Sequence, residues 1–233
     1  MKKSTLATLG VFLLLIPATL FLGTKIPGRS FYFTGTLMII ELMLPFFLSF
    51  EGRKPQAREL VLVAVLCAIA VAGRVVIPFP NIKAVYAIII LAGIAFGPET
   101  GFIVGAITAF ASNFFYSQGP YTPWQMMAYG AGGMLAGFLF KKGRLPREPM
   151  VMGVFGFCSV IFWIGPLLDC SHVFLMLSKI TPSAVIATVL SGLFSANLML
   201  AVSTLAFLLI FGVPFLKKLD RVKIKYGILD TQK

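Results

Sequence analysis

The sequence predicts an all-α integral membrane protein, a compact bundle of six core transmembrane helices plus two amino-terminal helices. Of its 233 residues, 58% are hydrophobic and only 12% are charged, a composition typical of membrane proteins. The apolar residues form long blocks instead of the narrow stripes of soluble helices. The cations, which give the chain a net charge of +12, cluster between and after these blocks.

The positions of the cations predict the orientation of the chain. With eight crossings and a cytoplasmic amino terminus, the cytoplasmic cations are Lys2, Lys3, Arg53, Lys54, Arg58, Lys141, Lys142, Arg144, Arg147, Lys217, Lys218, Arg221, Lys223, Lys225 and Lys233. Those outside or near the outer face are Lys25, Arg29, Arg74, Lys83 and Lys179. This positive-inside asymmetry predicts a multi-pass protein of the cell membrane, in contact with the lipid bilayer, with both termini cytoplasmic. It also explains the basic charge without a nucleic-acid partner.

Residues 1–50 are expected to form the amino-terminal pair of transmembrane helices. The block Leu6–Leu22 lacks a small-x-small cleavage pattern, so we expect a retained helix and not a signal peptide. The second block, Phe31–Phe50, holds Glu41 near its middle. A carboxylate at that depth costs ~2.5 kcal/mol or more unless it is protonated or paired. Glu41 is therefore either a ligand or ion contact, or a structural acid that is protonated or paired with a group such as Arg74.

Residues 51–59, EGRKPQARE, read as a cytoplasmic linker to a core over residues 60–216. The first core helix, Leu60–Ile77, carries Ala64, Ala68 and Ala72 at four-residue spacing. This spacing places three small side chains on one face and allows another helix to approach closely, from the same chain or from a partner.

Pro78 and Pro80 end that helix, and the next apolar block is short. Ala84–Phe96 has 13 residues, about 20 Å of helix against a hydrocarbon core of about 30 Å. Either the helix includes Ile82 and Lys83, or the turn Pro80–Lys83 dips below the membrane surface and lines a cavity.

The next two core helices, Gly101–Phe115 and Met126–Phe140, are joined by a polar hairpin, Tyr116–Gln125 (YSQGPYTPWQ). Gly101 and Gly105 in one helix, and Gly133 and Gly137 in the other, suit close packing. The hairpin is either the rim of a solute-binding pocket or an ordinary extracellular turn.

A second polar rim is predicted at Asp169–Ile180, after the core helix Pro149–Leu168. Thr181 is expected to cap the last helix, with Pro182 at its first position. From there to Leu216 is too long for one crossing, so we expect the part before Gly192 to bend or to lie along the outer surface. Asn197 either reaches the cavity or bonds a neighbouring helix. Residues 217–233 are expected to be a basic cytoplasmic tail.

Catalytic and metal-binding patterns are absent from the sequence. It has no GxxxxGK[ST] phosphate loop, no HExxH and no GxSxG, so we expect no ATP hydrolysis by this chain and no catalytic residue. The three cysteines form no CxxC pair. Cys170 lies two residues from His172, but two ligands do not make a metal site. No metal or cofactor is therefore predicted.

Two segments resemble the S components of energy-coupling factor (ECF) vitamin transporters, most closely the cobalamin-specific type. They are ELVLVAVLCAIAVAGRVVIPFPNIK and GPETGFIVGAITAFASNFFYSQGPYTPWQMMAYGAGGMLAG, and the resemblance covers roughly 59–216. It implies a subunit of an ATP-driven importer that captures a vitamin outside the cell and docks onto one transmembrane coupling protein and two cytoplasmic ATPases. It also implies that Ala64, Ala68 and Ala72 meet the coupling protein. Cobalamin would be the transported substrate and not a cofactor.

The resemblance implies that the outer loops hold the substrate, and their side chains suit a large neutral ligand. Gln118, Thr122 and Gln125 offer uncharged donors and acceptors, while Tyr116, Tyr121, Trp124 and Tyr129 are able to cover an apolar ring system or to act as interfacial anchors. The other candidate binding residues are Arg74, Pro80, Asn81, Lys83, Asp169 and His172. Because Arg74 and Lys83 are cationic, an anionic vitamin remains an alternative substrate.

Three alternative functions remain at this point. The first is an S component for another vitamin. The second is an autonomous ion-coupled carrier, whose transport would depend on Glu41. The third is a membrane scaffold that binds no solute.

Overall fold

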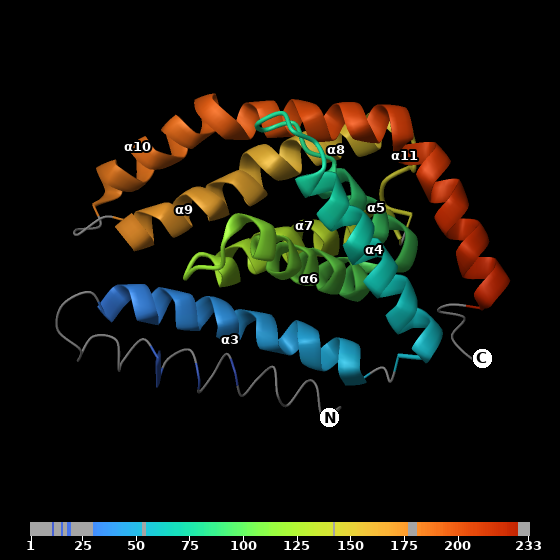
Figure 1. Ribbon diagram of the computed structural model, residues 1–233, viewed down its shortest axis with the longest axis horizontal. Helices are drawn as coiled ribbons and strands as arrows, with labels where there is room; N and C mark the ends of the chain where they lie inside the picture. Colours follow the sequence, from blue (N-terminus) through green and yellow to red (C-terminus); the bar gives the residue numbers. More distant parts are fainter. Residues whose placement is uncertain are drawn as a thin grey trace.

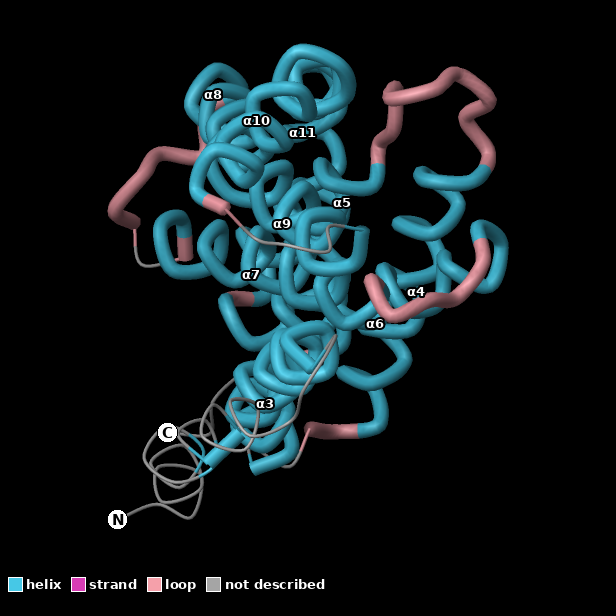
Figure 2. The backbone as a smooth tube through the Cα atoms, turned by 90° about the vertical axis from the view of Figure 1, so that its left-hand side faces the viewer, coloured by secondary structure: helices cyan, strands magenta, loops and turns pink. Residues whose placement is uncertain are grey.

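The computed structural model describes residues 11, 15, 18–19, 30–52, 55–141, 143–176 and 181–227, and all regular secondary structure within them is helical (Figure 1). The α-helices are α3 (Ser30–Gly52), α4 (Ala57–Val75), α5 (Val85–Phe96), α6 (Pro98–Tyr116), α7 (Thr122–Phe140), α8 (Pro149–Ser159), α9 (Gly165–Met176), α10 (Pro182–Gly192) and α11 (Leu198–Tyr226). Seen from one end, α3 lies on one side of the bundle, and α8, α10 and α11 lie on the opposite side (Figure 2).

Among the described residues, three helical stretches are long and apolar enough to cross a bilayer: Phe33–Gly52, Pro149–Val173 and Pro182–Tyr226. A helix also occupies each of the other predicted core segments. The first predicted span, Leu6–Leu22, lies almost wholly outside the described residues. The arrangement of six core spans plus two others therefore stays a prediction, while the helical membrane class is supported.

The short helix α5 forms the centre of the bundle. All of its residues except Ile88 are buried, and it packs against α4, α6, α7 and α11. The helix begins at Val85, so Ile82 and Lys83 are not helical, and the sequence alternative that included them is wrong. The preceding turn folds back along α4 instead, since Ala84 N donates to Gly73 O at 3.0 Å.

Glycines bring α6 and α7 into backbone contact. A Cβ added to Gly101 would lie 2.4 Å from the carbonyl oxygen of Gly133, and one added to Gly105 would lie 2.4 Å from that of Tyr129. No side chain fits at either position, so the two backbones approach as closely as glycine allows. The predicted glycine faces of these two helices are therefore packing surfaces within the chain.

The expectation that the predicted rim at Asp169–Ile180 is a loop is wrong for residues 169–176, because α9 continues to Met176. No glycine or proline interrupts the chain between Leu167 and Thr181, so nothing ends the helix at Asp169. A π-helical turn, Val160–Ile164, joins α8 to α9. Residues 177–180 lie outside the described residues.

The last helix is longer than the sequence suggested. Thr181 caps α10 as predicted, with Thr181 Oγ1 accepting from Ala184 N at 3.2 Å. A π-helical turn, Leu193–Asn197, leads from α10 into α11. The predicted basic tail at 217–233 begins inside α11, which runs to Tyr226 and ends where Gly227 adopts a positive φ of 58°; that the tail is cytoplasmic stays a prediction.

The amino-terminal helix α3 packs on the core through α6 and α7. Phe46 stacks on Phe102 with the ring centroids 4.4 Å apart. Glu41 is buried and accepts a hydrogen bond from Thr19 Oγ1, whereas Arg74 donates to Ser112 and Asn113 of α6. The suggested pairing of Glu41 with Arg74 is therefore not observed among the described residues.

Candidate functional site

A cavity in two neighbouring compartments lies at the end of the bundle where α4 ends and α5 begins. The larger compartment has a volume of about 570 Å³ and the smaller about 360 Å³. Both are lined by Arg74, Tyr116, Gln125, Leu168 and Leu200. These residues come from α4, α6, α7, α9 and α11, so the cavity depends on the packing of most of the core.

Arg74 lines both compartments, and contacts with neighbouring side chains hold its guanidinium in place. Its Nη1 donates to Ser112 Oγ, and to Asn113 Oδ1 at 2.9 Å. Its guanidinium carbon lies 4.9 Å from the ring centroid of Tyr116 and 5.6 Å from that of Tyr129. These contacts fix the guanidinium beside both compartments, and its remaining N–H groups can serve a bound solute.

Aromatic rings form one wall of the larger compartment. Tyr86 and Tyr129 meet edge to face with centroids 4.9 Å apart, and their hydroxyls are 3.4 Å apart. Gln125 lies nearby on α7, and its Oε1 is buried without a hydrogen-bond partner among the described residues. A buried acceptor of this kind is costly unless a ligand or water donates to it.

The loop between α4 and α5 closes one side of the larger compartment through Pro80, Asn81 and Lys83. Asn81 has a positive φ of 60°, a conformation that asparagine adopts more readily than most residues. Lys83 N donates to Ser203 Oγ at 3.0 Å, and Lys83 Nζ donates to Ile77 O. The first bond ties the loop to α11, and the second closes the loop on itself.

Acidic and amide groups distinguish the smaller compartment. Asn197 Nδ2 donates to Asp169 Oδ2 at 2.8 Å, which joins α9 to the π-helical turn before α11. Ser171 and His172 also line this compartment. Its walls therefore offer hydroxyl, imidazole and carboxylate groups in addition to the Arg74 guanidinium.

The structure brings most of the predicted binding residues to this cavity. Those that line it are Arg74, Pro80, Asn81, Lys83, Tyr116, Tyr121, Gln125, Tyr129, Asp169 and His172. Gln118, Thr122 and Trp124 line neither compartment. Thr122 is buried, accepts from Asn113 Nδ2 at 3.1 Å and donates to Gln118 Oε1 at 2.9 Å, so this part of the hairpin holds its own shape.

Ser171 belongs to the predicted polar rim, but sequence reasoning missed Tyr86 and Asn113 as lining residues. Tyr86 and Asn113 each lie in a predominantly apolar run. The signal that could have revealed them is a polar side chain close to a helix end that adjoins a predicted rim loop. Asn197 fulfils both of its predicted alternatives, since it lines the cavity and bonds a neighbouring helix. Among the described residues, no cluster of three potential metal ligands occurs, and Cys170 and His172 belong to none.

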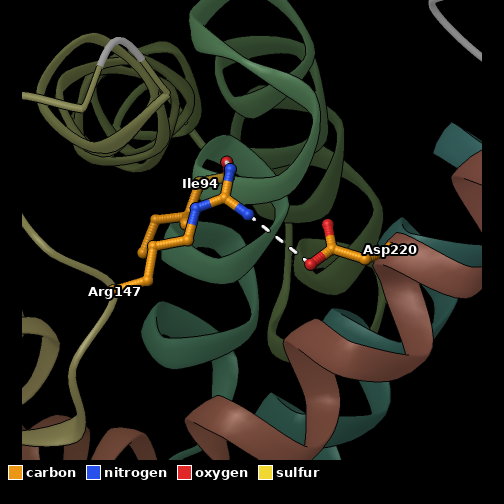
Figure 3. A network of polar contacts seen from close by, with 3 residues as sticks. All are labelled: Ile94, Arg147 and Asp220. Carbon is orange, nitrogen blue, oxygen red and sulfur yellow. Dashed lines mark hydrogen bonds and ion pairs between the residues drawn. The ribbon is translucent and has the colours of Figure 1, made fainter.

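The other end of the bundle is basic. Lys141 Nζ donates to Phe96 O at 3.0 Å, and Arg147 Nη2 donates to Ile94 O at 3.1 Å. Two cations therefore satisfy carbonyls in the last turn of α5, where the helix dipole also favours them. Arg147 Nη1 additionally lies 3.5 Å from Asp220 Oδ2, which connects this end to α11 (Figure 3).

The predicted docking alanines are accessible. Ala64, Ala68 and Ala72 are all exposed along α4, beside Val65 and Ile69. They are not used for packing within the described part of the bundle. The face is therefore available to a lipid or to another protein.

A helical membrane bundle with a polar, aromatic cavity at one end is a membrane protein equipped to bind a small solute. The family described as "ECF-type riboflavin transporter, S component" matches residues 54–221, and the chain belongs to this family. Comparison with curated proteins and with solved structures gave no match. The chain is thus a substrate-specific membrane subunit of an ECF importer and not an enzyme. The family match does not confirm the cobalamin-specific type.

Proposed function

We propose that this subunit captures riboflavin, or a flavin of similar size, and delivers it by docking to a coupling protein and two ATPases. The description of the matching family supports the vitamin. The observation that carries the proposal is that Arg74 and Gln125 each line both compartments. The imide edge of a flavin presents two carbonyl oxygens and one N–H. Arg74 supplies donors for the oxygens. Gln125 Oε1, which has no hydrogen-bond partner among the described residues, supplies an acceptor for the N–H.

The remaining lining groups suit the rest of a flavin. Tyr86, Tyr116 and Tyr129 provide aromatic surface for a flat tricyclic ring. Asp169, Ser171 and His172 in the smaller compartment suit the hydroxyls of a ribityl chain. The larger volume of about 570 Å³ falls within the range of small-molecule sites. A corrinoid is several times larger than a flavin and would require the loops to open.

The distribution of charge supports capture from outside the cell. The cavity and the described cations Lys141, Arg144, Arg147, Lys217 and Lys218 belong to opposite ends of the helices. The positive-inside rule favours a cytoplasmic position for the basic end, and with it an extracellular position for the cavity. Exposed Ala64, Ala68 and Ala72 then form the proposed contact with the coupling protein.

A binding screen tests the substrate. The purified chain, without ATP, is titrated by calorimetry with riboflavin, cobalamin, thiamine and biotin. We expect saturable binding of riboflavin at one site per chain and weaker or no binding of the others. Binding of cobalamin without riboflavin would overturn the flavin assignment while leaving the transporter class intact.

Uptake into proteoliposomes tests whether transport requires the coupling protein and the ATPases. We expect vesicles holding this chain alone to bind riboflavin without accumulating it, and vesicles that also hold the coupling protein and ATPases to accumulate it with ATP. Full uptake by the chain alone, driven by an ion gradient and lost in Glu41→Gln, would instead support the autonomous carrier.

A substitution on α4 tests the docking face. Ala68→Trp adds a large ring to the exposed alanine face, so we expect loss of co-purification with the coupling protein while riboflavin affinity is kept. Leu44→Trp, on the exposed face of α3, is the matched control and should assemble normally. Loss of both assembly and binding in Ala68→Trp would indicate misfolding and contradict the docking role.

A further inference from the structure

The carboxyl-terminal part of α11, residues 214–226, differs in character from the rest of that helix. Pro214 lies inside α11, and a proline within a helix removes a hydrogen bond and bends it. Figure 1 shows this part turning away from the long axis of the bundle and running toward the amino-terminal end of α4. We refer to residues 214–226 as the terminal segment.

Contacts with three other parts of the chain hold the terminal segment in place. Leu216 and Leu219 are buried against the core. Arg58 Nη1, at the start of α4, donates to Tyr226 O at 3.0 Å. Asp220 forms the ion pair with Arg147 that Figure 3 shows. The terminal segment is therefore a fixed element at the basic end of the bundle.

The face turned away from these contacts carries an array of cations. Lys217, Arg221 and Lys225 recur at four-residue spacing, which places them on one helix face, and Lys218 lies beside them. All four side chains are exposed. Asp220 is the single acidic residue of the segment, and it is paired with Arg147. The exposed charge of this face is therefore uniformly positive.

The cationic face continues an apolar face of the same helix. Ile210 and Phe211 are 64% and 54% exposed, as expected for side chains that meet lipid. They precede Lys217 and Lys218 by seven residues, which is about two turns at 3.6 residues per turn, so the two pairs share one face. Along that face the side chains change from apolar to cationic within about 10 Å, as occurs where a membrane helix leaves the hydrocarbon for the headgroups.

We infer that the terminal segment binds the headgroups of anionic phospholipids through Lys217, Lys218, Arg221 and Lys225. Juxtamembrane clusters of lysine and arginine are attracted to anionic lipids. Ile224 and Tyr226, which are 80% and 45% exposed, add the apolar and aromatic groups that amphipathic helices place at a membrane interface. The lipid anchors the basic end of the bundle in one leaflet, and this role is independent of which vitamin the cavity takes.

Lipid retention by the full chain tests this inference. The protein is placed in nanodiscs with equal amounts of phosphatidylglycerol and phosphatidylcholine of the same acyl chains, and native mass spectrometry measures the lipids that stay bound. We expect a preference for phosphatidylglycerol that falls about tenfold or more when Lys217, Lys218, Arg221 and Lys225 are all changed to Gln. Added sodium chloride should weaken the preference, because exposed charges are screened.

Matched variants separate this face from its alternatives. Lys217→Arg/Lys218→Arg/Lys225→Arg keeps the charge and should keep the preference, as should Arg144→Gln, which removes an exposed cation outside the terminal segment. Riboflavin affinity and the melting temperature check the fold. If the quadruple variant unfolds, Lys218→Glu alone is used and should reduce the preference.

Three results would overturn the inference. One is an unchanged lipid preference in the folded quadruple variant. Another is displacement of phosphatidylglycerol by inorganic phosphate beyond the effect of sodium chloride at equal ionic strength, which would identify a site for a free anion. The third is a folded quadruple variant that keeps its lipid preference but no longer assembles with the ATPases, which would make this face a protein contact.

Discussion

At the scale of single residues, Arg74 connects the structure of the cavity to its proposed chemistry. Its hydrogen bonds to Ser112 and Asn113 and its contacts with Tyr116 and Tyr129 hold the guanidinium before any solute arrives. A donor that is already oriented loses little conformational freedom on binding. Arg74 therefore contributes to affinity through its position as well as through its charge.

Arg74→Gln tests this contribution. Removing the donor should lower riboflavin affinity about tenfold to a hundredfold, as expected for hydrogen bonds from a charged group worth about 1.5–3 kcal/mol. Arg74→Lys keeps the charge but lacks the planar fork, so it should recover only part of the affinity. Calorimetry measures both, with Arg144→Gln at the opposite end as the control. An affinity equal to that of the unmodified chain would contradict the role of Arg74.

Sequence reasoning found the cavity residues that stand out from their neighbours. Arg74 and Lys83 are charges beside apolar runs, and Tyr116 and Gln125 lie in a polar hairpin. Tyr86 and Asn113 were missed because the side of the helix that faces a cavity depends on packing between helices distant in the sequence. Trp124 was expected at the rim, yet it is buried. The prediction failed because an aromatic residue at the start of a helix is found both at rims and in cores.

At the scale of helices, the contact between α6 and α7 positions both ends of the hairpin that borders the cavity. Gly101 and Gly133 approach with no space for a side chain. Sequence spacing predicted these faces, because glycine, which has no side chain, allows such proximity. The same kind of spacing at Ala64, Ala68 and Ala72 belongs to an exposed face, so spacing alone does not say whether a small-residue face packs inside or outside the chain.

Gly101→Ala tests how tightly α6 and α7 are packed. A Cβ 2.4 Å from the Gly133 carbonyl oxygen forces the helices apart, so we expect a loss of about 1–3 kcal/mol in stability and a lower melting temperature. Gly52→Ala, where a Cβ meets nothing within 4 Å, is the control and should change little. Equal melting temperatures in the two variants would contradict the close contact.

Helix ends were predictable where proline or glycine marks them and not elsewhere. Pro78, Gly97 and Pro182 bound helices as expected from the sequence. The continuation of α9 past Asp169 and of α11 past Leu216 was missed, because polar residues alone do not stop a helix. The two π-helical turns were not anticipated as such, although Gly165 and Pro166 directly follow Val160–Ile164 and Gly192 directly precedes Leu193–Asn197.

At the scale of the whole molecule, α3 lies outside the residues that match the family, 54–221, yet it packs on the family core. Phe46 and Phe47 both contact the ring of Phe102, and Ser49 Oγ donates to Glu99 Oε1 at 3.0 Å. The sequence predicted a helix here from its apolar length, but it could not indicate which face of the core the helix covers.

Phe46→Ala tests whether α3 supports the core or takes part in binding. We expect the loss of the stacked ring to lower stability by about 1–2 kcal/mol, since Phe46 is only partly buried, with riboflavin affinity unchanged. Thermal unfolding and calorimetry measure the two quantities. Phe33→Ala, on the same helix but 80% exposed, should leave both as they are. A large loss of affinity in Phe46→Ala would show that α3 shapes the cavity.

The shortness of α5 has a consequence for transport. Its 12 residues span about 18 Å, well below the ~30 Å of a hydrocarbon core, and the cavity lies directly above its first turn. With the cavity at the extracellular end, as proposed, a molecule held there would rest beneath the level of the lipid headgroups. It would then already lie part of the way across the bilayer, and the transport step proposed for the partner ATPases would have a shorter distance to cover.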